Sequence, residues 1–121
     1  MDFEKAIIEL KKIVPLKENI DVNDIVLFIL PDMSIYGIVS KIKIDGYKRN
    51  WWNISFTMLT IPLKKYTLTL RIEQMTGKEI FTIDGKQHFL SAVDIDKVNE
   101  KTKEPDKISR PKLSIVKKDN N

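Results

Sequence analysis

Aromatic rings and cations stand together in the stretch KRNWWNISF, residues 48–56, where two adjacent tryptophans follow Lys48 and Arg49. An exposed indole ring can stack on a nucleobase while neighbouring cations contact phosphate, so these residue types suit a single-stranded nucleic acid. Successive side chains of a strand point to opposite faces, so the two rings cannot share an environment. Trp52 falls in register with the apolar residues of this stretch and is predicted to point inward, whereas Trp51 is predicted to face outward.

The candidate binding residues are those that share the hairpin, or an outward strand face, with Trp51. They are Trp51, Tyr47, Lys48, Arg49, Lys41 and Lys43. The alternative for Trp51 is a structural role, in which its ring packs under an N-terminal helix or against the C-terminal tail while Lys48 and Arg49 only solubilise a hairpin tip. Tryptophan is buried on average and cations on turns are common, which slightly favours the structural alternative.

Residue types for catalysis and metal binding are missing or isolated. The chain has no cysteine and one histidine, His88, which excludes thiolate sites and multi-imidazole zinc sites. Asp94 and Asp96 share one face of a predicted strand, as a hard cation would require, but a third ligand is missing. The four glycines match neither a P-loop nor a dinucleotide-binding fingerprint. We therefore expect a structural role for His88, no catalytic residue, no cofactor and no metal site.

An amphipathic helix is predicted over residues 2–14, because apolar residues recur there at helical spacing. Asp2 is placed to cap its start, and Pro15 ends it. A helix of about three turns is marginal in water by itself, so it needs a surface to pack against. The start of the chain also lacks the long apolar run of a signal peptide or membrane span, so we expect a cytoplasmic protein without a membrane partner.

From residue 24 onward the hydrophobic pattern is that of strands. Residues 25–30 are continuously apolar, which predicts a strand buried on both faces, one against the core and the other against the helix or another subunit. The alternation in residues 35–44 predicts an inward set and an outward set. The inward set is Ile38, Ile42 and Ile44, and the outward set includes Lys41 and Lys43.

Further strands and two hairpin turns complete the predicted sheet. The strands are residues 51–58, 66–75, 78–83 and 87–95, and the turn signals are Asp45-Gly46 and Asp84-Gly85. The predicted fold class is mainly β, with an N-terminal amphipathic helix followed by a five- to six-stranded antiparallel small barrel that is closed or nearly closed.

The chain divides into three predicted parts. Residues 1–21 hold the helix and its connector, residues 22–96 the small β-barrel, and residues 97–121 a basic tail. The simplest interpretation of the tail is a mobile linker. Its short apolar stretch LSIV, residues 113–116, alternatively adds a strand to an exposed sheet edge.

The order of elements resembles the small SH3-like barrels, which include KOW and Tudor modules and the Sm-like proteins. DIVLFILPDMSIYGIVSKIKI, residues 24–44, carries this resemblance, with Gly37-Ile38-Val39-Ser40-Lys41-Ile42 in the place of a G-[IV]-V-x-x-I strand, followed by WWNISF. A helix ahead of five bent strands is similar to the Sm-like arrangement in particular. The Sm-like nucleotide-pocket signature and the Tudor aromatic cage are missing, so no binding residue is carried over. The resemblance implies a module that binds RNA, DNA, peptides or copies of itself.

The net charge of +4 is unevenly distributed along the chain. Residues 22–96 hold nine basic and eight acidic groups, whereas residues 97–121 hold eight and four. A near-neutral barrel favours a non-catalytic interaction or assembly module that binds a partner protein or itself. The alternative is a sequence-tolerant binder of RNA or single-stranded DNA that uses Trp51, the cations of residues 41–49 and the tail. Clustering of the cations in space would favour this alternative.

Overall fold

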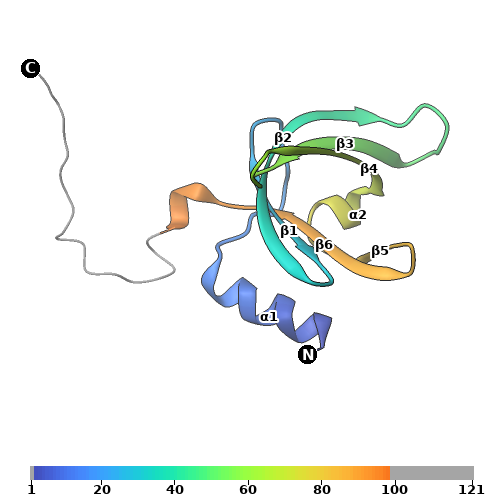
Figure 1. Ribbon diagram of the computed structural model, residues 1–121. Helices are drawn as coiled ribbons and strands as arrows, with labels where there is room; N and C mark the ends of the chain where they lie inside the picture. The colour runs from blue at the N-terminus through green and yellow to red at the C-terminus, as the bar shows by residue number, and fades with distance from the viewer. Residues whose placement is uncertain (1, 99–121) are drawn as a thin grey trace, which may run out of the picture.

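The computed structural model describes residues 2–98, which form a helix and a six-stranded antiparallel sheet that curls into a half-barrel (Figure 1). The elements are α1 (Phe3–Ile13), β1 (Ile25–Leu30), β2 (Met33–Ile44), β3 (Trp51–Met58), β4 (Lys64–Arg71), α2 (Ile72–Met75), β5 (Phe81–Ile83), β6 (Lys86–Ala92) and the 3-10 helix η1 (Ile95–Lys97). The strand order across the sheet is β4-β3-β2-β1-β6-β5. The predicted fold class, mainly β with an N-terminal helix, is confirmed.

Inward-pointing side chains fill the concave side of the curled sheet and form the inner core. The largest fully buried ones are Phe28, Phe56, Ile54, Leu90, Val26 and Val39. Phe28 meets the ring of Phe56 edge-on at 5.1 Å between centroids. His88 is also buried, stacks on Phe81 at 5.9 Å and places Nδ1 2.9 Å from the carbonyl oxygen of Lys86. This environment gives His88 the structural role that was predicted.

Helix α1 packs on the outer side of β1 and β6, as Figure 1 shows. Its buried residues Ile7 and Val14 belong to an outer cluster with Leu27, Ile29 and Phe89. Strand β1 is therefore buried on both faces, as its apolar sequence predicts, and the second face is covered from within the same chain. Asp2 occupies the N-cap position of α1, but its side chain makes no capping hydrogen bond.

A β-bulge at Ser40 interrupts the pairing of β2 with β3. Val39 lies opposite Phe56 and Lys41 lies opposite Ser55, so Ser40 is an extra residue on the β2 side. One inserted residue reverses the alternation of side chains beyond it, because the period of a strand is two. Val39 and Lys41, two residues apart, thus lie on opposite faces.

Because of the bulge, one of the three residues predicted to point inward lies on the outer face, and the other two point inward. Val39 is fully buried in the inner core, while Ile38 lies on the outer face, so the predicted inward position of Ile38 is wrong. Ile42 and Ile44 follow the bulge and point inward as predicted, although Ile44 extends past the core and is 67% exposed. Gly37 precedes the bulge on β2. A Cβ atom at this position would be 2.9 Å from the carbonyl oxygen of Thr57, which is too close for any residue other than glycine without a shift of β3.

Three predicted strands end or begin elsewhere than the sequence suggests. The strand predicted over residues 78–83 starts only at Phe81, in β5. Strand β4 ends at Arg71, and α2 follows, so the strand predicted to continue to residue 75 is wrong and Ile72 is largely exposed. The side chain of Gln74 accepts a hydrogen bond from the Arg71 amide at 3.0 Å and caps this turn. Strand β6 ends at Ala92, so Asp94 and the η1 helix lie beyond the sheet and the predicted strand face shared by the two aspartates is not formed.

The barrel is open rather than closed within the part of the chain that the structure describes. Strands β4 and β5 are the two edges of the sheet and do not pair with each other. Helix α2 contacts β3, β4 and β6 and so lies across the opening. In residues 2–98 no helix is both long and apolar enough to cross a lipid bilayer. The predicted tail beyond Val98, with its LSIV stretch, lies outside the described residues.

Candidate functional site

The hairpin that joins β2 to β3 is organised around the carboxylate of Asp45. Oδ2 accepts hydrogen bonds from the amides of Tyr47 at 3.1 Å and Lys48 at 2.6 Å, and Oδ1 accepts one from the Asn53 side chain at 3.0 Å. These bonds, the one from the Lys48 amide above all, hold the pKa of the Asp45 carboxyl below its ordinary value. The Asp45 amide donates to the carbonyl of Trp51 at 2.9 Å, so the loop places Lys48 beside Trp51.

Trp51 lies on the outer face of the sheet, half-buried and bordered by cations. The Nζ atom of Lys48 is 4.4 Å from the centre of its ring, and the guanidinium carbon of Arg71 is 5.9 Å away. Helix α1 packs on β1 and β6, so the alternative in which this ring packs under the helix is wrong. The other alternative, packing against the tail, concerns residues outside the described range.

Three neighbouring strands present a common outer surface, here named the outer face of β2–β4. Its residues are Tyr36, Ile38, Lys41 and Lys43 of β2, Trp51, Asn53, Ser55 and Thr57 of β3, and Lys65, Thr67, Thr69 and Arg71 of β4. Four of these strand residues are cations and none is a carboxylate. Asp45 contacts the face through Asn53, and Glu73 and Glu79 contact it through Arg71, so the positive charge is concentrated at the lysines.

The cations of this face differ in how they are held. Arg71 is engaged by Glu79 at 2.8 Å and Glu73 at 3.8 Å. Lys41, Lys43 and Lys65 are exposed, and among residues 2–98 no carboxylate lies within 4.0 Å of any of their ammonium groups. These three lysines are therefore the charges of the face most available to a ligand.

Polar side chains fill the area between the cations. The Thr69 hydroxyl donates to Asn53 Oδ1 at 2.7 Å, and the hydroxyls of Ser55 and Thr67 are 3.0 Å apart. These pairs link β3 to β4 across the face and fix the orientation of their hydrogen-bonding groups. The surface thus combines a half-buried aromatic ring, free ammonium groups and ordered hydroxyls and amides.

The structure brings together four of the six predicted site residues. Trp51, Lys48, Lys41 and Lys43 lie on or beside the outer face of β2–β4. Tyr47 and Arg49 lie in the connecting loop, where Tyr47 is 99% exposed. Their side chains make no hydrogen bond or ion pair within the described part of the chain.

Arg71 and Lys65 belong to the same surface but were not predicted as site residues. The alternation of residues 66–71 places Arg71 outward, which is the only sequence signal for it. Its position beside Trp51 depends on the register between β3 and β4, in which the two residues are directly paired. Lys65 pairs with Thr57 in the same register.

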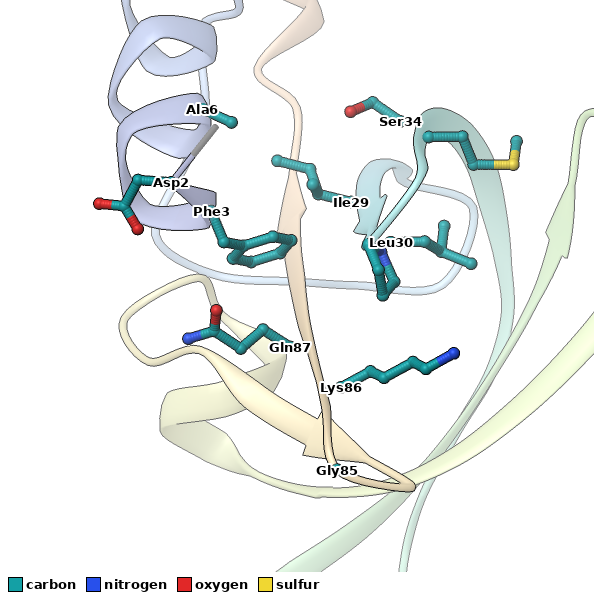
Figure 2. A pocket seen from close by; sticks show the side chains of 11 residues that line it. Asp2, Phe3, Ala6, Ile29, Leu30, Ser34, Gly85, Lys86 and Gln87 are labelled. Carbon is teal, nitrogen blue, oxygen red and sulfur yellow. The ribbon is translucent and has the colours of Figure 1, made fainter.

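A hollow of about 570 Å³ lies elsewhere, between the first turn of α1 and the turns that follow β1 and β5. Figure 2 shows Phe3 reaching from the helix into its middle, with the carboxylate of Asp2 and the ammonium of Lys86 at opposite sides of the view. The polar groups around the hollow do not converge on a common point, which a specific ligand site requires.

The described residues offer no metal-binding group of three or more acidic or histidine side chains. In comparisons with protein-family models, curated proteins and solved structures, no match to this chain was found. The function is therefore inferred from the chemistry of the surfaces themselves.

Proposed function

We propose that this chain is a non-catalytic small-barrel module that binds single-stranded nucleic acid through the outer face of β2–β4. The observation that carries the proposal is the segregation of charge: Lys41, Lys43 and Lys65 share the outer face with Trp51, and none of the three has a carboxylate within 4.0 Å among residues 2–98. The near-neutral count for residues 22–96 also includes the carboxylates that contact this face at Asn53 and Arg71 and those that lie elsewhere. Spatial clustering of this kind, rather than net charge, attracts a polyanion.

Binding would place a base on the ring of Trp51 and phosphates near Lys41 and Lys43. Lys48 lies over the ring and must move aside, which costs about 0.5–1 kcal/mol for a cation–π contact at an exposed site. Stacking of a base on an aromatic side chain contributes about 1–3 kcal/mol. The exchange is therefore favourable, and the displaced ammonium group stays close to the phosphate backbone.

The second face of β1 is one of the features that suggested an assembly module. The apolar run of residues 25–30 predicts a surface that either the helix or another subunit covers. Helix α1 covers it, so this surface needs no partner. The hypothesis of a protein partner then depends on other apolar residues.

We also propose that the half-barrel is of the SH3-like, and specifically the Sm-like, kind. An N-terminal helix precedes four consecutive strands β1 to β4 that neighbour one another in the sheet, and the last strand, β6, returns to pair with β1. This is the order of elements that the resemblance in residues 24–44 and WWNISF implies. Such modules use a shared scaffold for different ligands, so the ligand is argued from the surface.

The test is a titration of the full chain with mixed-sequence single-stranded DNA, followed by tryptophan fluorescence at several salt concentrations. We expect Lys41→Gln/Lys43→Gln to weaken binding and to reduce the slope of log K against log salt by about 1.4, the value for two lost phosphate contacts on a single strand. The control, Lys5→Gln/Lys12→Gln, makes the same charge change on the exposed side of α1 and should leave the slope unchanged.

Two results would contradict this proposal. One is an equal effect of both double variants, which would indicate attraction by overall charge. The other is complete loss of binding when the chain is truncated after Val98, because the nucleic acid would then be held by the tail. Retained binding of the truncated chain, with the Lys41 and Lys43 dependence intact, assigns the affinity to the outer face.

A second candidate function, self-association or binding of a protein partner, is favoured by the loop between β3 and β4. Leu59, Ile61 and Leu63 are all exposed in this loop, Ile61 completely. The Leu59 amide donates to the carbonyl of Tyr36 at 3.0 Å, which fixes the start of the loop beside another exposed apolar residue. Exposed apolar residues gathered in this way are typical of contact surfaces.

Sedimentation velocity of the full chain over a range of concentrations tests this second function. We expect a concentration-dependent dimer or larger species that the variant Ile61→Ser/Leu63→Ser abolishes. The control Ile8→Ser removes an exposed apolar residue of α1 and should not affect assembly. A monomer at all concentrations would exclude self-association through this loop.

A further inference from the structure

The inner side of the sheet forms a groove at the end where Trp52 lies. The groove has a volume of about 610 Å³ and lies between the connector that follows α1, the inner faces of β2 and β3, and α2. Its apolar lining consists of Ile20, Val22, Ile42, Trp52, Ile72 and Met75. Ile44 pairs with Trp52 and extends the same surface. A concave apolar surface of this size can hold several side chains of a ligand.

The rim of the groove is acidic. Glu18, Asp21 and Glu73 line it, against a single cation, Lys78, among the described lining residues, and Glu73 also lies 3.8 Å from Arg71 of the outer face. Glu18 and Asp21 make no ion pair within the described residues, so the rim has the opposite sign to the outer face of β2–β4. A ligand that is apolar in the middle and basic at its ends complements both the lining and the rim.

The connector wall of the groove is held in place by Asp24. Its carboxylate accepts a hydrogen bond from Lys17 Nζ at 2.9 Å and another from the amide of Asp21 at 2.8 Å. The bond to Asp24 also raises the pKa of Lys17 above its ordinary value. The wall is therefore formed before a ligand arrives, which reduces the ordering cost of binding.

We infer that this groove binds residues 110–118 of the same chain, RPKLSIVKK. This segment carries Leu113, Ile115 and Val116 between four cations and contains no acidic residue. Its apolar middle matches the lining of the groove, and its basic ends match the acidic rim. The inference does not depend on the proposed nucleic-acid function, because it concerns the opposite face of the sheet.

The alternative position for this segment, as a strand added to the sheet edge, is disfavoured by charge. The long free edge is β4, which carries Lys64, Lys65 and Arg71 and no acidic residue. Cations on an edge strand hinder pairing with a further strand, and they repel a basic one in particular. The groove is the more favourable position for a segment with four positive charges.

The length of the chain permits this contact. Fourteen residues lie between Val98, the last described residue, and Leu113. An extended chain of that length spans up to about 50 Å. A domain of about 100 residues has a radius of gyration of about 13 Å, so the segment can reach any part of its surface.

Paramagnetic relaxation in the full chain tests the inference. The chain lacks cysteine, so Ser114→Cys provides a unique attachment point for a nitroxide label. We expect the label to cause selective loss of the methyl signals of Ile42, Ile72 and Val22, which line the groove. The methyl signals of Ile8, an exposed residue of α1, should keep their intensity.

A charge reversal on the rim supplies the matched variant. Glu18→Lys should restore the methyl signals of the groove, whereas Glu9→Lys, the same change on α1, should not. Uniform or absent signal loss would overturn the inference, as would loss concentrated along β4. A further sample mixes chains that carry the nitroxide with chains that do not, and the methyl signals of the chains without nitroxide are observed. An equal loss of their groove signals would show that the groove binds the segment of a second copy, and this result would also overturn the inference.

Discussion

Trp51 and Trp52 are neighbours in the sequence, yet they lie in opposite environments on the two sides of β3. Trp52 packs against the inner core and lines the apolar groove with the acidic rim. Trp51 lies on the outer face among hydroxyls and cations, with the ammonium group of Lys48 4.4 Å from its ring centre. The alternation of a strand is enough to separate two identical side chains in this way.

The same separation applies to charge. The strand residues of the outer face of β2–β4 include four cations and no carboxylate, while the groove on the inner side carries mainly carboxylates at its rim. A count over the sequence cancels these two surfaces and gives a near-neutral barrel. The partners of this small β-sheet protein should therefore follow from the charge of each face and not from the net charge of the chain.

Val39→Lys should have the largest effect, because this side chain is fully buried on the inner side of β2 directly before the bulge. An unpaired cation in the core and a lost apolar contact should together destabilise the protein by about 3–5 kcal/mol. Urea unfolding followed by circular dichroism measures this. The control Ile38→Lys makes the same change on the outer face, and a Val39 variant as stable as that control would contradict the assigned faces.

Trp52→Ala should destabilise the fold by about 2–4 kcal/mol, slightly less than truncation of a fully buried aromatic side chain, because the ring is only partly covered. Binding of single-stranded DNA by the folded variant should be unchanged, since the ring faces the groove. Thermal or urea unfolding gives the first quantity and a fluorescence titration through Trp51 gives the second. Loss of DNA binding without loss of stability would place the site on the inner side.

Trp51→Ala should have the reverse profile. We expect a stability loss below about 1 kcal/mol, the size of its cation–π contact, and a loss of affinity for single-stranded DNA of about 1–3 kcal/mol, the size of one stacking interaction. Unfolding in urea and DNA titration by fluorescence anisotropy of a labelled oligonucleotide separate the two effects. If Trp51→Ala proved more destabilising than Trp52→Ala, the assigned faces would be wrong.

Protonation of Asp45 should have the smallest effect and should be confined to the hairpin. Its carboxyl has a lowered pKa in the folded protein, so the stabilisation is fully present above the ordinary aspartate value of about 3.9 and is lost as pH falls through the lowered folded value. We expect the amide signals of Tyr47 and Lys48 to shift together below about pH 4 while signals of the inner core do not. The Asp45→Asn variant should lack this transition. A transition of the whole molecule at the same pH would contradict a local role.

The sequence predicted those features that local periodicity determines. The helix, the doubly buried β1 and the opposite faces of Trp51 and Trp52 follow from the spacing of apolar residues. The inward position of Ile38 was wrong because the bulge at Ser40 depends on pairing with β3.

The end of β4 and the composition of the site could not be predicted either. Residues 72–75 continue the strand alternation in the sequence. The strand nevertheless ends at Arg71, because the Gln74 side chain accepts a hydrogen bond from the Arg71 amide and α2 makes contacts across the open barrel. The position of Arg71 beside Trp51, and the groove around Trp52, exist only once strands distant in the sequence are in register. Long-range pairing of this kind leaves no local pattern.

The most direct test of the account is a titration of the 15N-labelled full chain with an oligothymidylate, observing the two indole N–H signals by NMR. We expect the Trp51 indole signal and the amides of Lys41 and Lys43 to shift progressively with saturation, while the Trp52 indole signal stays in place. A shift of the Trp52 signal with an unchanged Trp51 signal, or no shift of either, would contradict the assignment of nucleic-acid binding to the outer face of β2–β4.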